Sequence, residues 1–466
     1  MMSQIHAAAR FLFPFVFLGS ILLFHPRPCH SMQDAFDLLK KHIIAYNLKA
    51  IDQSIIDGSY RGEEGILRIR PGTANSLGIQ AYRDEDYADS IRLYRNAEKY
   101  LEEAKHMMAA REKEKDSGFY IERIADNFLL YRRSKEQAEE KIMIYRSRIN
   151  PGLDERLDTT ITEKRMVTLL EDSFAKTEYR LRDGLAYFYN RCRGLHKKRY
   201  PLTPGNVQFV NTIFNTFLDL AHEESLSLFD LDRNSSYPID RMPSNWKTVA
   251  DPAMLKFADI IEAVCRSSGD TIYAVDPLLF IALLKKESDF DPLSVSSVGA
   301  VGLTQIMPRT AKDMGMNNIH LPEYYIKAES LIREERELRR LAISSLFRID
   351  ESNRKKYAKQ ARKLMQRSLD IALEREKLFS RYKRELLNEM TDDRLQPEIA
   401  IKYGFRYFAG LMRDQNGDIS LALASYNAGP HRVKEYKGIP PFSETVGFRN
   451  RILKYYHDYR NRLEKR

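Results

Sequence analysis

One long stretch of the sequence contains neither glycine nor proline, and this constrains the fold more than any other feature. It runs from Glu323 to Gln396, between two prolines, and is dense in Arg, Lys and Glu. Apolar or small residues recur in it at a helical spacing, including Tyr357, Ala361, Leu364, Ser368, Ala372, Phe379, Tyr382 and Leu386. The only turn-like sequence is "IDESN" at 349–353. The stretch predicts a charged, antiparallel helical hairpin that projects from its domain.

The region before it also has a helical period. Around residues 91–101, five apolar side chains fall close to one helix face: Ile91, Leu93, Tyr94, Ala97 and Leu101. Similar patterns recur at 118–148, 160–192 and 206–229. Turn-forming sequences, "NPG" at 150–152 and "PLTPG" at 201–205, separate them. No fixed repeat period is found. Residues 32–245 therefore predict a mostly helical region, and the turn-rich segment 233–254 predicts a linker.

One stretch of this region departs from the helical pattern. Residues Glu64–Ile91 contain a short strand-like run, a Pro-Gly turn and then a helical pattern. It faintly resembles the start of a LysM carbohydrate-binding module. The preferred interpretation is a local hairpin or loop.

The N-terminus has the layout of a secretory signal peptide. A single positive residue, Arg10, precedes the apolar run Phe11–Phe24, and the small residues Cys29 and Ser31 suit cleavage before Met32. The run is short for a spanning helix, which needs about 20 residues. Residues 1–31 therefore predict a signal peptide and a mature chain in the periplasm or cell envelope. An uncleaved membrane anchor is the alternative.

The composition limits partners and cofactors. The net charge of +10 favours an anionic partner, although a solvated basic surface explains it equally well. No basic patch interleaved with aromatic residues is present, so a nucleic-acid partner is not expected. Cys192 and Cys265 follow the signal segment, too few for a disulfide framework, and a bridge between them is the less favoured alternative. No metal-ligand spacing appears, so no metal and no cofactor are expected.

A single acid ends the most apolar predicted helix. Asp276 is a good N-cap and Pro277 a good first residue for "PLLFIALLKKE", which ends at Glu287. A free Glu has a pKa of about 4.3 and is almost fully ionised at pH 7. Desolvation against apolar neighbours raises the pKa of a carboxyl group. The pattern is thus compatible with a general acid, but a Glu at a helix end is usually just solvated, and this alternative is favoured at this point.

The sequence around Glu287 resembles a known family. "ESDFDPLSVSSVGAVGLTQIMP", Glu287–Pro308, matches without gaps the pattern E-S-x-F-[ND]-P followed by S-x-x-G-A-x-G-L-x-Q-x-M-P. That is the catalytic core of the soluble lytic murein transglycosylases (SLT family). "ALASYNAGPHRV" at 422–433 resembles the family's second block, and "IPPFSETVGFRNRILKYY" at 439–456 its third. The resemblance covers about 255–321 and 396–460.

The resemblance implies a mainly α fold. It consists of a helical N-terminal region followed, over 246–466, by a lysozyme-like transglycosylase domain into which the 323–396 hairpin is inserted. It also implies cleavage of the peptidoglycan bond between N-acetylmuramic acid and N-acetylglucosamine, with a 1,6-anhydro product. Glu287 matches the catalytic Glu, acting first as acid and then as base. Because a substrate acetamido group can replace a second carboxylate, neither Asp289 nor Asp291 is needed.

Further site residues follow from the same match. Ser296 and Gln305 match polar cleft residues, and Met307 a cleft-lining one. Tyr426 matches a Tyr close to the catalytic acid, whose hydroxyl is expected to orient the carboxyl group. The remaining matched positions are Asn427, which shapes the turn, and Glu444, which closes the domain or contacts sugar. Taken alone, Ser296, Gln305 and Met307 would be a turn residue, a surface amide and a core residue.

Two glycines of the matched pattern have an expected role, and the sequence departs from the family pattern at two positions. Gly299 and Gly302 are expected to allow close approach of the backbone to the glycan. Thr304 stands where Met is usual, and His431 where Gly is common.

Two alternative functions stay open: a lysozyme-like peptidoglycan hydrolase and a non-catalytic peptidoglycan-binding scaffold. The N-terminal region and the 323–396 hairpin are candidate contacts for an envelope protein partner. An inert, solvated arm is the other interpretation of the hairpin.

Overall fold

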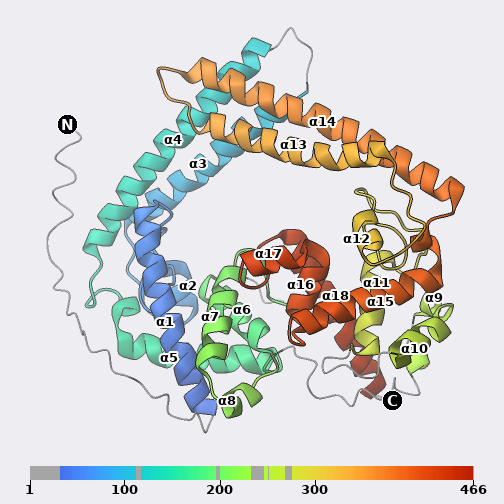
Figure 1. The fold of residues 1–466 in the computed structure, drawn as a ribbon. Helices are drawn as coiled ribbons and strands as arrows, with labels where there is room; N and C mark the ends of the chain where they lie inside the picture. The colour runs from blue at the N-terminus through green and yellow to red at the C-terminus, as the bar shows by residue number, and fades with distance from the viewer. Residues whose placement is uncertain are drawn as a thin grey trace.

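The computed structural model describes residues 32–111, 117–195, 200–231, 246–249, 251–267 and 275–464. Their regular structure consists of α-helices and short 3₁₀ helices, and β-structure in these ranges is confined to isolated bridges (Figure 1). The prediction of a mainly α fold is confirmed. The predicted signal peptide and most of the predicted linker lie outside the described residues.

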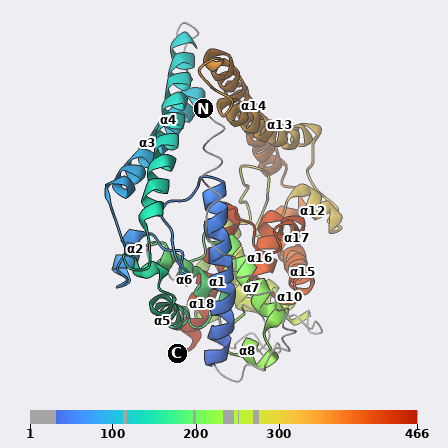
Figure 2. The ribbon, with the colours of Figure 1, turned by 90° about the vertical axis from the view of Figure 1, so that its left-hand side faces the viewer.

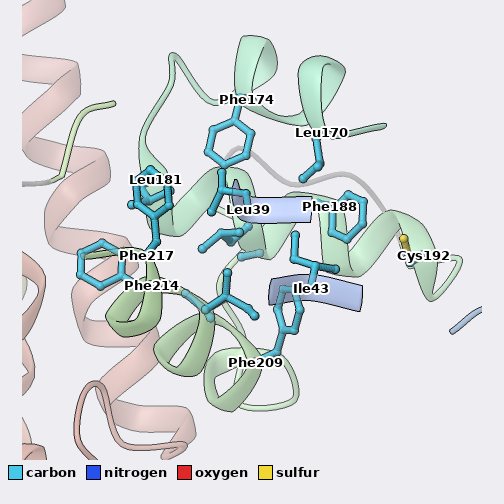
Figure 3. Packing of buried hydrophobic residues seen from close by; sticks show 14 of the residues in the cluster. Leu39, Ile43, Leu170, Phe174, Leu181, Phe188, Cys192, Phe209, Phe214 and Phe217 are labelled. Carbon is cyan, nitrogen blue, oxygen red and sulfur yellow. The ribbon is translucent and has the colours of Figure 1, made fainter. Parts of the chain in front are cut away.

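The N-terminal half is a bundle that carries a long hairpin. Its helices are α1 (Met32–Ile56), α2 (Pro71–Ser76), α3 (Glu85–Ala109), α4 (Ser117–Arg148), α5 (Thr159–Lys176), α6 (Leu181–Cys192), α7 (Val207–Leu220) and α8 (Glu223–Ser227). Helices α1, α5, α6 and α7 turn their apolar faces to one core (Figure 3). That core includes Leu39, Ile43, Leu170, Phe174, Phe188 and Phe209. Helices α3 and α4 pair along their length and extend away from the bundle (Figure 2).

The C-terminal half has the same general layout. Its helices are α9 (Pro252–Leu255), α10 (Ala258–Ser267), α11 (Pro277–Ser288), α12 (Pro308–Asp313), α13 (Glu323–Leu346), α14 (Arg354–Glu389), α15 (Pro397–Asp414), α16 (Ile419–Ala428), α17 (Pro430–Glu435) and α18 (Ser443–Glu464). Helix α11 is the central one, because every residue of 278–284 is buried. Helices α10, α15, α16 and α18 surround it and complete the core.

Local sequence sets both ends of α11. The Asp276 carboxylate accepts a hydrogen bond of 2.8 Å from the backbone N–H of Leu278, and Pro277 is the first helical residue. The helix ends where Asp289 takes a left-handed conformation, with φ 51°. This end places Glu287 in the last turn of a helix whose preceding turns are entirely buried.

The predicted helical hairpin is present as α13 and α14, but its tip is not a solvated arm. Its tip packs against the tip of the α3–α4 hairpin, and Ala342, Leu346 and Ala361 share a buried cluster with Ala104 and Phe128. Polar contacts border this cluster: Arg354 to Glu122 and Asp126, Arg132 to the Ile349 carbonyl, and Arg362 to the Met107 carbonyl. The two hairpins thus form an arch that joins the two halves (Figure 1).

The halves also meet directly through their bundles. Arg182 makes a buried bidentate ion pair with Asp418, at 3.0 and 2.6 Å. Arg449 and Asp183, both fully buried, lie 2.7 Å apart. Buried charges need such partners, because an unpaired charge in the interior is costly. The two halves of the chain are therefore in contact at two places, between the bundles and between the hairpin tips.

The structure also bears on the two cysteines. Cys192 and Cys265 are not joined in a disulfide, so the less favoured alternative of a bridge between them is wrong. In the described part of the chain, no helix combines the length and the apolar character that crossing a membrane requires.

Candidate active site

Glu287 lies half-buried at the C-terminal end of α11. The pKa of Glu287 is raised to about 8, mainly by burial of its carboxyl group; the charge of Lys286 opposes this rise and the nearby charge of Glu444 contributes to it. A carboxyl group with this pKa is mostly protonated at neutral pH. It is thus held in the form that a general acid needs.

The segment after α11 folds back against the end of that helix. It is a compact turn with two isolated bridges, Val295 to Val301 and Val301 to Ile306. The Ser288 hydroxyl donates a hydrogen bond of 3.0 Å to the carbonyl oxygen of Leu303, which fixes the turn beside Glu287. The segment 294–307 is called the catalytic turn below.

Gln305 lies inside the catalytic turn in a left-handed conformation, with φ 48°. Its side-chain nitrogen donates hydrogen bonds to the carbonyl oxygens of Ser294 and Gly302, at 3.0 and 2.9 Å. The side chain is therefore fixed, and a contact with substrate would come from its amide oxygen. A simple surface amide does not describe this residue.

Arg394 supports the catalytic turn from the return end of the hairpin. Its guanidinium group is buried and donates to the Ile306 carbonyl at 3.1 Å, to the Asp392 carboxylate at 2.9 and 2.7 Å, and to the Tyr382 hydroxyl at 2.6 Å. Tyr382 belongs to α14 and Asp392 follows that helix. The base of the hairpin is therefore part of the site.

The two glycines of the turn allow close contacts within the protein, and their expected contact with glycan stays a prediction. A Cβ atom on Gly302 would lie 1.9 Å from the carbonyl oxygen of Arg394. One on Gly299 would lie 2.4 Å from the ring of Tyr325. Both glycines also have positive φ, 77° and 87°, which other residues rarely adopt.

Tyr426 approaches the catalytic turn from α16. Its hydroxyl donates a hydrogen bond of 2.6 Å to the carbonyl oxygen of Thr304. Burial and the neighbouring charge of Glu287 raise the pKa of Tyr426 well above its ordinary value, so the phenol stays neutral. The hydroxyl proton of Tyr426 is already donated to Thr304, so Tyr426 cannot also donate it to Glu287. A hydrogen bond between the two side chains would therefore run from a protonated Glu287 to the Tyr426 oxygen.

Asn427 and Glu444 connect α16 with the start of α18. The Asn427 side-chain oxygen accepts a hydrogen bond of 2.7 Å from the hydroxyl of Thr445. Glu444 is exposed in the first turn of α18 and is close enough to raise the pKa of Glu287. The structure thus brings the side chains of Glu287, Tyr426 and Glu444 to one place.

Ser296 and Met307 occupy more ordinary positions. The Ser296 hydroxyl accepts a hydrogen bond of 2.9 Å from the backbone N–H of Ala300, as expected of a turn serine. Met307 is half-buried and precedes α12 as its N-cap residue. Their contacts with substrate stay predictions.

The two aspartates that follow Glu287 are engaged elsewhere. Asp289 is exposed and pairs with Lys285 at 2.7 Å. The Asp291 carboxylate accepts a hydrogen bond of 2.9 Å from the backbone N–H of Leu293 and so stabilises a turn. Among the described residues, no group of three or more His, Cys, Asp or Glu could hold a metal ion.

The sequence around this site matches a known protein family. Residues 266–330 and 349–445 match the family described as Transglycosylase SLT domain. The chain contains a transglycosylase SLT domain. All seven predicted site residues fall within the matched ranges, and residues 331–348, in the outer part of the hairpin, fall outside them.

One curated relative is the transglycosylase of Enterobacteria phage PRD1, 41% identical over 63 residues. These residues make up 13% of this chain and 24% of the phage protein, so the chain spans about a quarter of that relative's length.

Two solved structures are similar over most of the chain, but at low TM-scores. An inactive mutant of the lytic transglycosylase Slt from Pseudomonas aeruginosa is 14% identical, with 93% of this chain and 74% of that chain covered and a TM-score of 0.26. The 70 kDa soluble lytic transglycosylase from Escherichia coli is 15% identical, with 92% and 72% covered and a TM-score of 0.28.

Sequence reasoning missed the residues that support the catalytic turn of the SLT domain. It placed Arg394, Asp392 and Tyr382 in the predicted hairpin, with Tyr382 among its apolar positions, and gave none of them a role at the site. A signal was available in the sequence, because "DERL" at 154–157 nearly repeats "DDRL" at 392–395. A charged pair that recurs in two places indicates a structural role.

Proposed function

We propose that this protein is a lytic transglycosylase that cleaves the glycan strands of peptidoglycan. The observation that carries the proposal is the environment of Glu287, whose pKa is raised to about 8 by burial, within a matched SLT domain. The acid is thus protonated before the substrate binds. The second carboxyl group that influences it, on Glu444, is exposed at the surface.

The proposed reaction proceeds in two proton transfers through Glu287. The protonated carboxyl group donates its proton to the glycosidic oxygen, and the bond from that oxygen to C1 of N-acetylmuramic acid breaks. The acetamido oxygen of the same sugar stabilises the positive charge at C1. The Glu287 carboxylate then takes the proton of the C6 hydroxyl, O6 bonds to C1, and a 1,6-anhydro ring closes. Glu287 ends protonated, and no water is consumed.

Tyr426 and Gln305 position the groups that react. The Tyr426 oxygen accepts a hydrogen bond from protonated Glu287, which orients the acid toward the glycosidic oxygen. The Gln305 amide oxygen, held by the bonds to Ser294 and Gly302, receives a polar group of the sugar. We also propose that Ser296, Met307, Asn427 and Glu444 contact the glycan close to Glu287.

Mass spectrometry of the products released from purified sacculi tests the proposal. Muropeptides with 1,6-anhydro ends are expected, each lighter by one water than a hydrolytic product. Reducing ends would show that the domain acts as a lysozyme-like hydrolase. No soluble product, together with retained binding to sacculi, would show a non-catalytic scaffold.

The place of action is proposed to be the periplasm or cell envelope. Peptidoglycan lies there, and residues 1–31 have the n-, h- and c-region order of a signal peptide. N-terminal sequencing of protein extracted from the envelope should find a start near Met32. An intact Met1 on protein from the cytoplasmic fraction would contradict this.

A further inference from the structure

The N-terminal half contains a second version of the catalytic turn. Residues 62–79 align without gaps with 299–316. Seven positions are identical, namely Gly62/Gly299, Gly65/Gly302, Ile69/Ile306, Pro71/Pro308, Thr73/Thr310, Ala74/Ala311 and Gly78/Gly315. The segment that faintly resembles a LysM module is thus similar to another part of the same chain.

The two segments also fold alike. Each has an antiparallel bridge, Glu64 to Ile69 in one and Val301 to Ile306 in the other. Each continues into a six-residue helix that starts at the shared proline, α2 or α12. Arg68 has φ 50° where Gln305 has φ 48°, although neither residue is glycine. A rare conformation at the same aligned position is strong evidence of a common fold.

The same buried arginine supports each turn. Arg156 donates to the Ile69 carbonyl at 2.9 Å, to Asp154 at 2.9 and 2.7 Å, and to the Tyr145 hydroxyl at 2.8 Å. These contacts match those of Arg394 with Ile306, Asp392 and Tyr382 one by one. A Cβ on Gly65 would lie 1.9 Å from the Arg156 carbonyl oxygen, as one on Gly302 would from that of Arg394.

The helices around the turns correspond as well. In each half a long hairpin, α3–α4 or α13–α14, separates the turn from its arginine, and α5 and α15 follow with 18 residues each. One hydrogen bond between side chains has a counterpart in the other half. The Asn206 amide donates to the Asn190 side chain at 3.0 Å, and in the C-terminal half the Thr445 hydroxyl donates to the Asn427 side chain at 2.7 Å. The rings of Tyr189 and Phe209 lie 5.0 Å apart, and those of Tyr426 and Phe448 lie 6.3 Å apart.

Contacts between the halves are reciprocal, as in a two-fold symmetric dimer. The Asn211 side chain donates to the Ile439 carbonyl at 2.9 Å, and the Asn450 side chain donates to the Leu202 carbonyl at 2.8 Å. Asn211 and Asn450 occupy equivalent positions near the starts of α7 and α18, in the matching sequences "VQFVN" and "VGFRN". The two hairpins meet tip to tip in the same way. Self-complementary contacts of this kind are typical of two copies of one fold.

The second copy lacks the acid. The Asn47 side chain donates to the Ile66 carbonyl at 2.9 Å, just as Ser288 donates to that of Leu303, so the residue in place of Glu287 is Tyr46. The Tyr46 ring lies 5.2 Å from that of Phe209. A neutral phenol is a far weaker acid than a carboxyl group. This half therefore cannot perform the proton transfers proposed for Glu287.

The second copy nevertheless keeps an open cavity at this place. The cavity has a volume of ≈ 610 Å³ and is lined by His42, Tyr46, Lys49, Arg68, Gln208 and Thr212, among others. Within the described part of the chain, the buried Nε atom of Arg68 and Nε2 atom of His42 have no hydrogen-bond partner. Native proteins satisfy nearly all buried polar atoms, so two unsatisfied atoms on side chains that line the cavity point to a polar partner there.

We propose that residues 32–231 form a non-catalytic copy of the SLT fold, and that the cavity of Tyr46 and Arg68 binds a second segment of peptidoglycan glycan. The inference rests on the proposed function. The aromatic ring of Tyr46 suits a sugar face, and the guanidinium group of Arg68 suits a carboxylate of the lactyl group or peptide stem. Lys49 adds a second positive charge to the cavity wall, and Asp57 adds one negative charge. One protein would then hold a strand at one site and cleave at the other.

Calorimetric titration of the full chain tests this inference. The protein carries Glu287→Gln, which prevents turnover, and the probe is a purified, uncross-linked muropeptide tetrasaccharide. Two binding sites per chain are expected. Adding Arg68→Gln should weaken one of them at least tenfold, and adding Gln305→Ala should weaken the other. The matched control Arg92→Gln, an exposed arginine of α3 outside the cavity, should change neither.

The outcomes separate the inference from the proposed function. One site that is insensitive to Arg68→Gln and is lost with Gln305→Ala would overturn the second site alone. No binding at all would overturn the proposed function as well. If Arg68→Gln lowers the unfolding temperature, Thr212→Trp replaces it, because this exposed residue on the cavity wall can be enlarged without loss of a buried contact. Thr212→Trp should remove the same site, and two intact sites in it would overturn the inference.

Discussion

The guanidinium group of Arg394 donates a hydrogen bond of 3.1 Å to the carbonyl oxygen of Ile306, across 88 residues of sequence. Ile306 follows Gln305 in the catalytic turn, whereas Arg394 closes the long hairpin of α13 and α14. The hairpin therefore cannot be an independent insertion throughout its length. Its base holds the turn that lies beside Glu287, and only its outer part is remote from the site.

Replacing Arg394 with Ala is expected to destabilise the protein strongly. The variant leaves the Asp392 carboxylate buried without its cation, and breaking such a pair costs about 3–5 kcal/mol. Unfolding in urea, followed by circular dichroism, should show this loss. The control is Arg340→Ala, which breaks an exposed pair with Glu337 and should cost less than about 1 kcal/mol. Equal effects of the two variants would show that Arg394 does not support the turn.

Replacing Glu287 with Gln is expected to abolish lysis of purified peptidoglycan. General acid–base catalysis contributes about 10²–10⁴-fold, and here one residue performs both proton transfers, so the loss should reach at least that range. Release of anhydro-muropeptides measures it. Asp289→Asn is the control, because Asp289 is exposed and pairs with Lys285, and it should keep near-normal activity. Activity of the Gln variant within tenfold of the parent would refute the assignment.

The same substitution is expected to change the pH dependence of stability. The folded protein holds the pKa of Glu287 at about 8, above the ordinary value of 4.5, so the favourable burial of the neutral carboxyl is fully present below pH 4.5. This stability is lost as the pH rises from there through 8, because the unfolded chain releases the proton first. The free energy of unfolding falls by about 1.4 kcal/mol for each pH unit within this window.

Thermal unfolding of the parent and of Glu287→Gln measures this effect. Gln stays neutral at every pH. The unfolding temperature of the variant, relative to that of the parent, should therefore rise by several degrees between pH 5 and 9 and should not rise below pH 4. A constant difference across the whole range would show that Glu287 is not buried in its neutral form.

The sequence allowed the helical class and the SLT domain to be predicted from local information. The period of α14, the cap at Asp276 and the gap-free run from Glu287 to Pro308 are all features of neighbouring residues. Long-range partners were not accessible in this way. Nothing local to Arg394 shows that its guanidinium group reaches Ile306, and nothing local to Gly302 shows that the Arg394 carbonyl lies against it.

The internal similarity is hidden in the sequence for a related reason. Only short segments, such as 62–79 and the starts of α7 and α18, keep identical residues, while a helix pair such as α5 and α15 keeps its length but little of its sequence. A solenoid would show a fixed short period, whereas this chain holds two copies of a whole domain. Tyr46 in place of Glu287 also removes the residue that would have drawn attention to the first copy.

The last prediction concerns the outer part of the hairpin. Replacing residues 336–373 with a short Gly/Ser linker removes Ala342, Leu346 and Ala361 from the tip cluster but keeps Tyr325, Tyr382 and Arg394 at the base. Cleavage of short glycan fragments should therefore persist. Amide hydrogen exchange at the tips of α3 and α4 should rise, because Ala104 and Phe128 lose their partners. The wider replacement of 325–394 serves as the contrast, since it also removes Arg394 and should abolish cleavage of the same fragments. If the narrow replacement is as inactive as the wide one, the tip contact is needed to form the site. If exchange at α3 and α4 does not change, the hairpins do not meet in solution.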